Sequence, residues 1–170
     1  SSLIKSGFYK NILIVNSSFY SRVKDISCSF SVALGDSVGA MVVSEVPADR
    51  GYMGSHCITD GFNHAAFTVE NRRPYEEFRE GTTDPAPFFT FDYDKAKSAT
   101  RLSKERVVTV FNEILAQNGL AKEAVDLFIP HQGLHWLPAV WCDCIGIDTA
   151  KVCHTFDKYG SNAASSVPVN

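Results

Sequence analysis

The sequence predicts an α/β fold, and three observations along the chain carry this prediction. Short apolar runs at 11–18 (NILIVNSS) and 125–130 (VDLFIP) have the length and composition of strands. Between them, residues 103–120 (SKERVVTVFNEILAQNGL) place apolar side chains at helical spacing. Strands that alternate with helices along a chain are typical of α/β domains.

The first half of the chain is expected to be mostly strand. The run at 11–18 is continuously apolar, which favours a strand buried on both faces. Residues 30–45 (FSVALGDSVGAMVVSE) predict a strand, an interruption and a second strand, with Gly35 and Gly39 allowing either a bulge or a close backbone approach. Residues 51–61, bounded by glycines, have moderate strand character.

The second half begins with a long excursion at 62–93 that is rich in polar residues and contains Pro74, Pro85 and Pro87. Ordered loops of this length are usually lids or binding loops. The helix at 103–120 is expected to begin at an N-cap Ser103 and to end at Gly119. A strand at 125–130, a helix from about 133 to 144, a strand at 151–156 and a segment of small residues at 158–170 follow.

The composition excludes several classes of protein. Hydrophobic residues make up 45% and charged residues 21% of the 170 residues, as in an ordinary globular domain. A net charge of −3 without a basic run gives no reason to expect nucleic acid, and no apolar stretch approaches the roughly 20 residues that span a membrane. The five cysteines lack a disulfide framework, so we expect a reducing, cytoplasmic setting. A C-x-C pair in a helix points its thiols to different faces, which argues against a metal site at Cys142, Cys144, Cys153 and His154.

Three stretches, read in order, resemble one family. The stretch LGDSVGAMVVSE at 34–45 resembles the F-G-D-G-A-G-A signature of the β-ketoacyl-acyl-carrier-protein synthase III family of thiolase-like condensing enzymes. IPHQG at 129–133 resembles that family's I-P-H-Q-A-N, and DKYGSNAASSVPV at 157–169 resembles its R-Y-G-N-T-S-A-A-S-I-P-V. The opening residues 3–22 also resemble the helix and strand that follow the family's nucleophile. Each motif alone is a weak signal, but three in order at the family's spacing form a strong one.

The resemblance implies a thiolase-like fold, a layered α/β/α/β/α sandwich. Residues 1–47 would form the end of its N-terminal half and residues 48–170 most of its C-terminal half. The family's nucleophilic cysteine lies just upstream of the helix that ends here at IKSG, and none of the five cysteines matches it. The resemblance therefore implies a partial chain. It also implies a homodimer.

The family's chemistry assigns a role to His131. An acyl group is carried as a thioester on the cysteine, and a histidine and an asparagine stabilise the enolate formed from a malonyl thioester. His131 matches that histidine and follows an apolar run, where strand ends of α/β sheets present ligand-binding residues. From the residues alone, a histidine beside an apolar run is more often structural than catalytic.

The second donor is left open between two residues. Ser161 stands at the asparagine position of the motif and Asn162 follows it. We expect cysteine-dependent acyl transfer in fatty-acid, polyketide or other secondary-metabolite biosynthesis, with His131 as general base for an alcohol, amine or thiol. The alternatives are decarboxylative condensation with a malonyl thioester, and a non-catalytic subunit paired with an active homologue.

The expected acyl donor is a thioester of coenzyme A or of acyl carrier protein, with no further cofactor and no metal. The helix at 133–144 lacks the lysines and arginines that the family presents to a carrier protein, and the coenzyme A-binding arginine is missing from DISCSF at 25–30. Trp136 and Trp141 could be core or a docking patch. Asp36 is expected to be structural, and Asp60 and His64 to be surface residues without partners.

Overall fold

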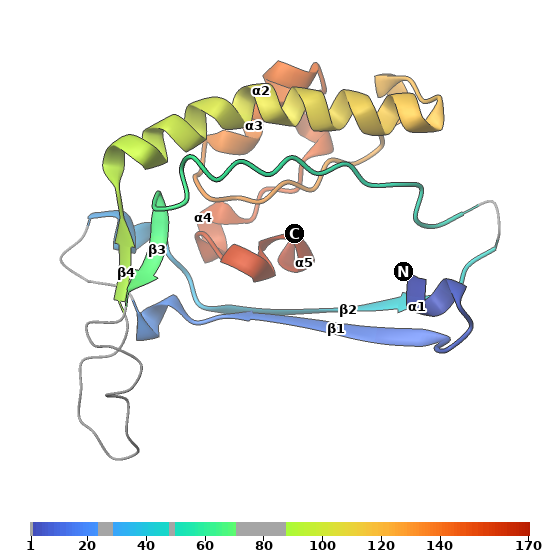
Figure 1. Cartoon of the computed structure of the whole chain (residues 1–170), viewed down its shortest axis with the longest axis horizontal. Coiled ribbons are helices and arrows are strands. Elements are labelled where there is room, and N and C mark those ends of the chain that lie inside the picture. The colour runs from blue at the N-terminus through green and yellow to red at the C-terminus, as the bar shows by residue number, and fades with distance from the viewer. Residues whose placement is uncertain (1, 24–28, 48–49, 71–87) are drawn as a thin grey trace, which may run out of the picture.

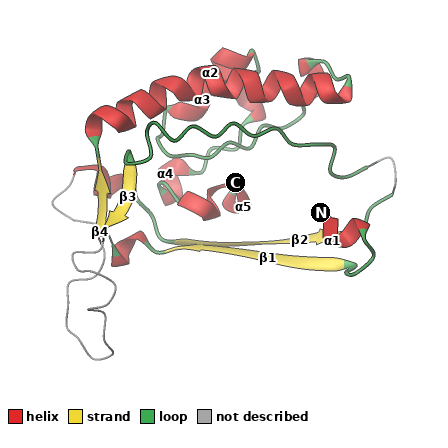
Figure 2. Ribbon diagram, viewed as in Figure 1, coloured by secondary structure: helices red, strands yellow, loops and turns green. Residues whose placement is uncertain are grey.

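A computed structural model describes residues 2–23, 29–47, 50–70 and 88–170. A long two-stranded ribbon runs along one side of the molecule and a long helix along the other, with short C-terminal helices between them (Figures 1 and 2). The strands are β1 (Asn11–Ser18), β2 (Ser37–Ser44), β3 (Phe67–Glu70) and β4 (Phe88–Phe91). The helices are α1 (Ser2–Lys5), α2 (Tyr93–Asn118), α3 (Leu137–Ile145), α4 (Phe156–Tyr159) and α5 (Ser166–Val169). No helix among these residues is long and apolar enough to cross a membrane.

Strands β1 and β2 pair antiparallel in an unbroken register from Asn11↔Ser44 to Ser18↔Ser37. The strand expected at 11–18 is confirmed, but its burial on both faces is not, because Leu13 is 65% and Val15 57% exposed. These side chains lie on the face opposite to the one that packs against α5 and the turn at 163–165. Of the two strands expected at 30–45, only the second forms, and Ser29–Ala33 is a 3-10 turn.

Close backbone approaches explain the small residues in two segments of the chain. A Cβ atom on Gly35 would lie 1.9 Å from the Tyr159 carbonyl oxygen, and one on Gly39 would lie 2.6 Å from Pro168 Cβ. The close-approach interpretation of both glycines is therefore confirmed, and the unbroken register rules out a bulge at Gly39. Ser165 fixes the same contact, because its Oγ donates a hydrogen bond to the Asn16 carbonyl at 3.0 Å. The C-terminal segment thus packs directly on the β1–β2 ribbon.

Helix α2 begins eleven residues earlier than the sequence suggested. Its N-cap is Asp92, whose carboxylate accepts a hydrogen bond from the Lys95 backbone N–H at 3.0 Å. Ser103 lies inside the helix and donates to the Thr100 carbonyl at 2.7 Å, so its assignment as N-cap was wrong. The predicted end at Gly119 is confirmed by a left-handed φ of 61°. One face of α2 packs against α3.

The strands expected at 125–130 and 151–156 reduce to one parallel bridge between Phe128 and Val152. The two segments still lie side by side, because the Phe128 N–H donates to the Lys151 carbonyl at 2.9 Å. In the excursion at 62–93, β3 and β4 form an antiparallel pair with Phe67 opposite Phe91. The three prolines of that excursion lie outside the described residues.

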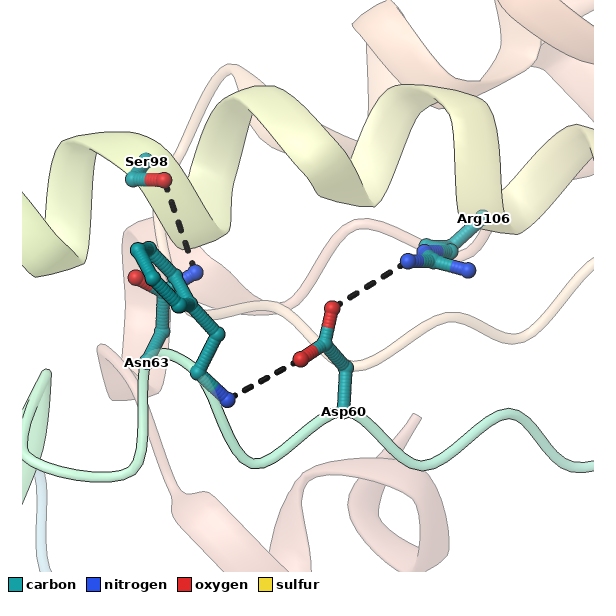
Figure 3. Close-up of polar contacts among 5 residues, drawn as sticks. Asp60, Asn63, Ser98 and Arg106 are labelled. Carbon is teal, nitrogen blue, oxygen red and sulfur yellow. Dashed lines mark hydrogen bonds and ion pairs between the residues drawn. The ribbon is translucent and has the colours of Figure 1, made fainter.

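Residues 51–61 form no strand but run as a loop beside α2 (Figure 1). Figure 3 shows what holds the end of this loop: Asp60 accepts from Arg106 Nη2 at 3.2 Å and from the Phe62 N–H at 2.9 Å. Asn63 Nδ2 also lies 3.4 Å from Ser98 Oγ. The expectation that Asp60 has no partner was therefore wrong. The same was wrong for His64, whose Nδ1 lies 3.1 Å from the Gly61 carbonyl.

Candidate functional site

A cavity of about 360 Å³ lies between α2, the loop before α3, and the turn that follows Gly160. Its wall is mostly apolar and draws on segments far apart in the sequence. The lining residues are Tyr20, Phe30, Leu34, Phe67, Phe89, Ala99, Thr100, Ser103, His131, Gly133, Leu134, Leu137, Trp141, Ser161 and Ala163. Two of the three residues expected to carry chemistry, His131 and Ser161, thus share one cavity. A mostly apolar hollow with a few convergent polar groups is the usual form of a ligand site.

The backbone around His131 is held by bonds from the C-terminal segment. Asn170 Nδ2 donates to the Pro130 carbonyl at 2.9 Å, and the Gln132 N–H donates to Ser166 Oγ at 3.0 Å. Residues on both sides of His131 are therefore fixed from 34 to 40 positions away in the sequence. This explains why the chain places polar residues directly after an apolar run.

The Gln132 side chain is the strongest of these anchors. It is 1% exposed, and its Nε2 donates to the Cys153 carbonyl at 2.6 Å. Its Oε1 accepts from the backbone N–H groups of Thr155 and Phe156, each at 3.0 Å. One amide thus satisfies three backbone groups from Cys153 to the first residue of α4, and so joins that segment to the His131 loop.

His131 is held in a state suited to proton transfer. Its side chain opens into the cavity, and the surrounding protein removes part of its hydration, which lowers the pKa of the imidazole below its ordinary value. The ring is therefore neutral at pH 7 and has one nitrogen that donates and one that accepts. A Cβ at Gly133 would lie 3.2 Å from Nε2, so the glycine leaves room beside that nitrogen.

Ser161 and Asn162 have different environments. The Ser161 N–H donates to the Ala33 carbonyl at 2.7 Å, and its carbonyl accepts from the Gly35 N–H at 3.0 Å, which fixes Ser161 in the cavity wall. Asn162 is 1% exposed and does not line the cavity. Its Nδ2 donates instead to the Tyr159 carbonyl at 3.0 Å. Of the two candidate second donors, Ser161 is the one beside the cavity.

The next residue, Ala163, has a φ of 43°, which is left-handed and unfavourable for a residue with a Cβ. Ala163 also lines the cavity. This turn therefore combines a strained backbone with a contact to the site.

Asp36 acts as expected, through structure. Its carboxylate accepts the Ser21 N–H at 2.8 Å and also the Ser21 hydroxyl. These bonds hold the 3-10 turn Tyr20–Arg22, which brings Tyr20 into the cavity wall. Burial raises the pKa of the Tyr20 phenol, so its hydroxyl is protonated and able to donate at neutral pH.

Sequence reasoning missed the aromatic wall. Phe30 lies with its ring centroid 5.9 Å from that of Phe67 and 6.1 Å from that of Phe89. Tyr20 meets Phe89 edge-to-face at 5.5 Å. The alternation in FFTF at 88–91 was a signal, since it places Phe89 and Phe91 on one face of a strand. What that face contacts depends on the pairing of β3 with β4.

The two tryptophans lie in different environments. Trp141 lies in the cavity wall, where its Nε1 donates to Ser103 Oγ at 3.0 Å, whereas Trp136 is 46% exposed. The thiols of the C-x-C pair face different environments as expected, because Cys142 is fully buried and Cys144 is exposed. Among the described residues, no three histidine, cysteine or acidic side chains form a group that could hold a metal.

Two models of one protein family match this chain. The family model for 3-oxoacyl-[acyl-carrier-protein] synthase III matches residues 1–61, and the model for the C-terminal part of the same enzyme matches residues 115–170. The chain belongs to the synthase III family. The loop of His131 and the turn of Ser161 both lie within the second match.

Individual relatives agree with this assignment. The chain is 29% identical over 170 residues to the β-ketoacyl-[acyl-carrier-protein] synthase III of Staphylococcus saprophyticus, covering 98% of this chain and 49% of the relative. The crystal structures of the synthase III enzymes of Aquifex aeolicus and Thermus thermophilus match with TM-scores of 0.79 and 0.81 at 24% and 21% identity. Each alignment covers 99% of this chain, and 49% and 51% of those chains. The fold is thus thiolase-like, and the chain spans about half the length of the synthase III relatives it matches.

Proposed function

We propose that the protein is a thioester-dependent acyltransferase of the synthase III type, with His131 as its general base. The observation that carries this proposal is the placement of His131 and Ser161 in the wall of one apolar cavity. The acyl group would be carried on a cysteine upstream of these residues, as the family resemblance implies, and none of the described cysteines lines the cavity.

The proposed transfer moves the acyl group from the cysteine to the acceptor in one cycle of proton transfer through His131. An acceptor alcohol, amine or thiol approaches the acyl-cysteine thioester, and neutral His131 removes its proton as the new bond to the acyl carbon forms. The carbon–sulfur bond then breaks, and the cysteine thiolate takes the proton back from the imidazolium. The lowered pKa of His131 favours this role, since the base must be unprotonated before each turnover.

Transfer is preferred to condensation because of the second donor. Stabilising an enolate requires two donors aimed at one oxygen. The amide of Asn162 already donates to the Tyr159 carbonyl, and Ser161 offers only a short hydroxyl arm.

Decarboxylative condensation with a malonyl thioester is the second candidate, and one observation favours it. Tyr20 lines the same cavity as His131 and Ser161, and its raised pKa keeps its hydroxyl protonated at neutral pH. It could supply the donor that the asparagine supplies in the family motif. We also retain the non-catalytic subunit as the outcome if no covalent acyl-enzyme forms.

The remaining parts of the proposal concern the whole protein. Residues 1–47 are assigned to the N-terminal half of the thiolase-like fold and residues 48–170 to the C-terminal half. A homodimer is proposed, with a coenzyme A or carrier-protein thioester as donor.

Intact mass spectrometry tests the function. The full protein is incubated with an acyl-CoA, or an acyl carrier protein, and with malonyl-CoA. A mass increase of one acyl group that is lost on adding an acceptor supports transfer, and release of carbon dioxide in the same tube supports condensation. Absence of an adduct with every donor would overturn the enzymatic proposal and leave the non-catalytic subunit.

The variants His131→Ala and Ser161→Ala separate the roles within the site. His131→Ala is expected to lower turnover by about 10²–10⁴-fold while leaving the covalent acyl adduct intact. Ser161→Ala should lower condensation more than transfer if its hydroxyl is the second donor. Unchanged turnover in His131→Ala would refute the role of that residue.

A further inference from the structure

Four phenylalanine rings pack together between the 3-10 turn Ser29–Ala33 and the β3–β4 pair. The ring centroids of Phe30, Phe67, Phe89 and Phe91 lie 5.4 to 6.4 Å apart in the pairs that touch, and their planes are inclined by only 13° to 35°. Phe89 and Phe91 share one face of β4, whereas the other two rings come from the turn and from β3. Three segments of the chain thus bring their rings into one similar orientation. We call these four side chains the ring cluster.

The ring cluster is open toward the cavity beside His131. Phe30, Phe67 and Phe89 all line that cavity, so each of them borders open space as well as its neighbouring rings. Phe67 is 46% exposed although it packs against three other rings. Aromatic rings attract one another in offset-stacked or edge-to-face contact at centroid distances of about 4.5–7 Å. A further ring placed in the cavity would therefore continue the arrangement that the cluster already has.

The remainder of the cavity wall suits an uncharged and rigid group. No lysine, arginine, aspartate or glutamate of the described chain lines the cavity. Ala99, Gly133 and Ala163 occupy three positions of the wall and take up little space there. An apolar cavity of about 150 Å³ is sufficient to bind benzene. The present volume of about 360 Å³ therefore holds one ring together with the atoms that join it to a reacting centre at His131.

The ring cluster distinguishes an aromatic group from an alkyl group of the same size. Burial of apolar surface has no directional preference and stabilises both. Contact between rings adds to that burial, and only an aromatic group gains it. We propose that the cavity binds a planar aromatic ring of the substrate. This inference rests on the proposed function, in which the acyl thioester and the acceptor meet beside His131, so the ring belongs to the acyl group or to the acceptor.

Binding of small probes to the full protein tests the inference without turnover. Benzyl alcohol and cyclohexylmethanol have the same carbon skeleton and the same hydroxyl group, and differ only in whether the ring is aromatic. Ligand-observed NMR measures the affinity of each probe. Benzyl alcohol is expected to bind about 3- to 10-fold more tightly, because it gains contacts with the rings of the cluster. Equal affinity, or tighter binding of cyclohexylmethanol, would overturn the inference.

The variant Phe67→Leu removes one ring from the cluster and keeps an apolar side chain. It should lower the preference for benzyl alcohol to less than about twofold, and leave the affinity for cyclohexylmethanol within about twofold of the wild-type value. Phe62→Leu is the matched control, because Phe62 is 76% exposed and does not line the cavity, and it should keep the wild-type preference. Full preference in a folded Phe67→Leu protein would contradict the role of the cluster. If that variant does not fold, the comparison of the two probes in the wild type still decides.

Turnover then assigns the ring to one of the two substrates. Phenylacetyl-CoA is compared with cyclohexylacetyl-CoA as donor, and benzyl alcohol with cyclohexylmethanol as acceptor. The aromatic member is expected to have a kcat/KM about threefold or more above its saturated counterpart in one of these two comparisons. An active enzyme with an aromatic preference in neither comparison would overturn the inference and leave the acyltransferase standing. If no donor acylates the protein, the proposed function fails, and binding of the two probes alone decides whether the cavity is a site for an aromatic ring.

Discussion

Replacement of Gln132 by methionine should lower the free energy of unfolding by about 3 kcal/mol, because it removes bonds that hold the segment around His131. The side chain is 1% exposed and forms three hydrogen bonds to backbone groups, one to the Cys153 carbonyl and two to the N–H groups of Thr155 and Phe156. Methionine has a similar length and fills the same space but replaces none of these bonds.

The size of the effect follows from the groups left without partners. A backbone group that loses its only partner in a buried site costs about 1–3 kcal/mol, so three such groups give about 3–9 kcal/mol. Cys153, Thr155 and Phe156 are only half-buried, and water can reach part of the gap, which places the expected loss near 3 kcal/mol. Since domains are stable by only about 5–15 kcal/mol, a loss of this size is easily measured.

The assay is urea unfolding of the wild type and the variant, followed by circular dichroism. Gln117→Met is the matched control, because Gln117 is exposed on α2, and its free energy of unfolding should change by no more than about 0.5 kcal/mol. Gln132→Glu refines the test, since a carboxylate still accepts both N–H groups but repels the Cys153 carbonyl unless it is protonated. The difference in free energy of unfolding between Gln132→Glu and the wild type should therefore become smaller as the pH is lowered from 8 to 5. A Gln132→Met variant within 1 kcal/mol of the wild type would refute the role of the amide.

Four further predictions concern Gly35, Ala163 and His131. Gly35→Ala places a Cβ 1.9 Å from the Tyr159 carbonyl oxygen and should cost at least about 3 kcal/mol in urea unfolding, whereas Gly61→Ala, with nothing within 4 Å, should change stability by less than about 0.5 kcal/mol. Ala163→Gly relieves a φ of 43° and should raise the free energy of unfolding by up to about 1 kcal/mol, and a loss of that size would contradict the strain argument. The lowered pKa of His131 means that kcat/KM should rise with pH only below about 6.5 and be flat above it, and a limb centred above pH 7 would exclude a neutral His131 as the base. Because the unfolded state binds the proton of His131 more readily, this residue also lowers stability as the pH falls below about 6.5, and His131→Gln should reduce that decline.

The elements that could be predicted from the sequence are those whose signals are local. The β1 strand follows from a continuous run of apolar residues, and the end of α2 from a glycine that adopts a left-handed conformation. The start of α2 was missed because its first turns carry small and charged residues, such as Ala96 and Lys97, rather than a row of large apolar ones. Its true signal, the cap at Asp92, lay inside a stretch that looked like loop.

At 125–130 and 151–156, in contrast, the sequence predicted strands that the structure does not contain. Their composition is that of strands, but a strand also requires a partner with which to form a ladder of hydrogen bonds, and here the two segments share a single bridge. The expectation that β1 is buried on both faces was wrong for a related reason, because no element packs on the face that carries Leu13 and Val15 among the described residues. Composition indicates which residues can be buried, whereas the neighbours in space decide which of them are.

By itself, the sequence determined the family and the match of His131 to the family's histidine, since the order of motifs is a property of the chain. It also indicated that Gly35 and Gly39 lie at close backbone approaches, since residue type is local. Only the tertiary structure decided that Ser161 rather than Asn162 lines the cavity of His131, because a one-residue difference in a turn redirects a side chain. It alone also brought Phe30, Phe67 and Phe89 into one wall of the cavity. These residues come from segments without local signals for each other, and their proximity is a consequence of packing.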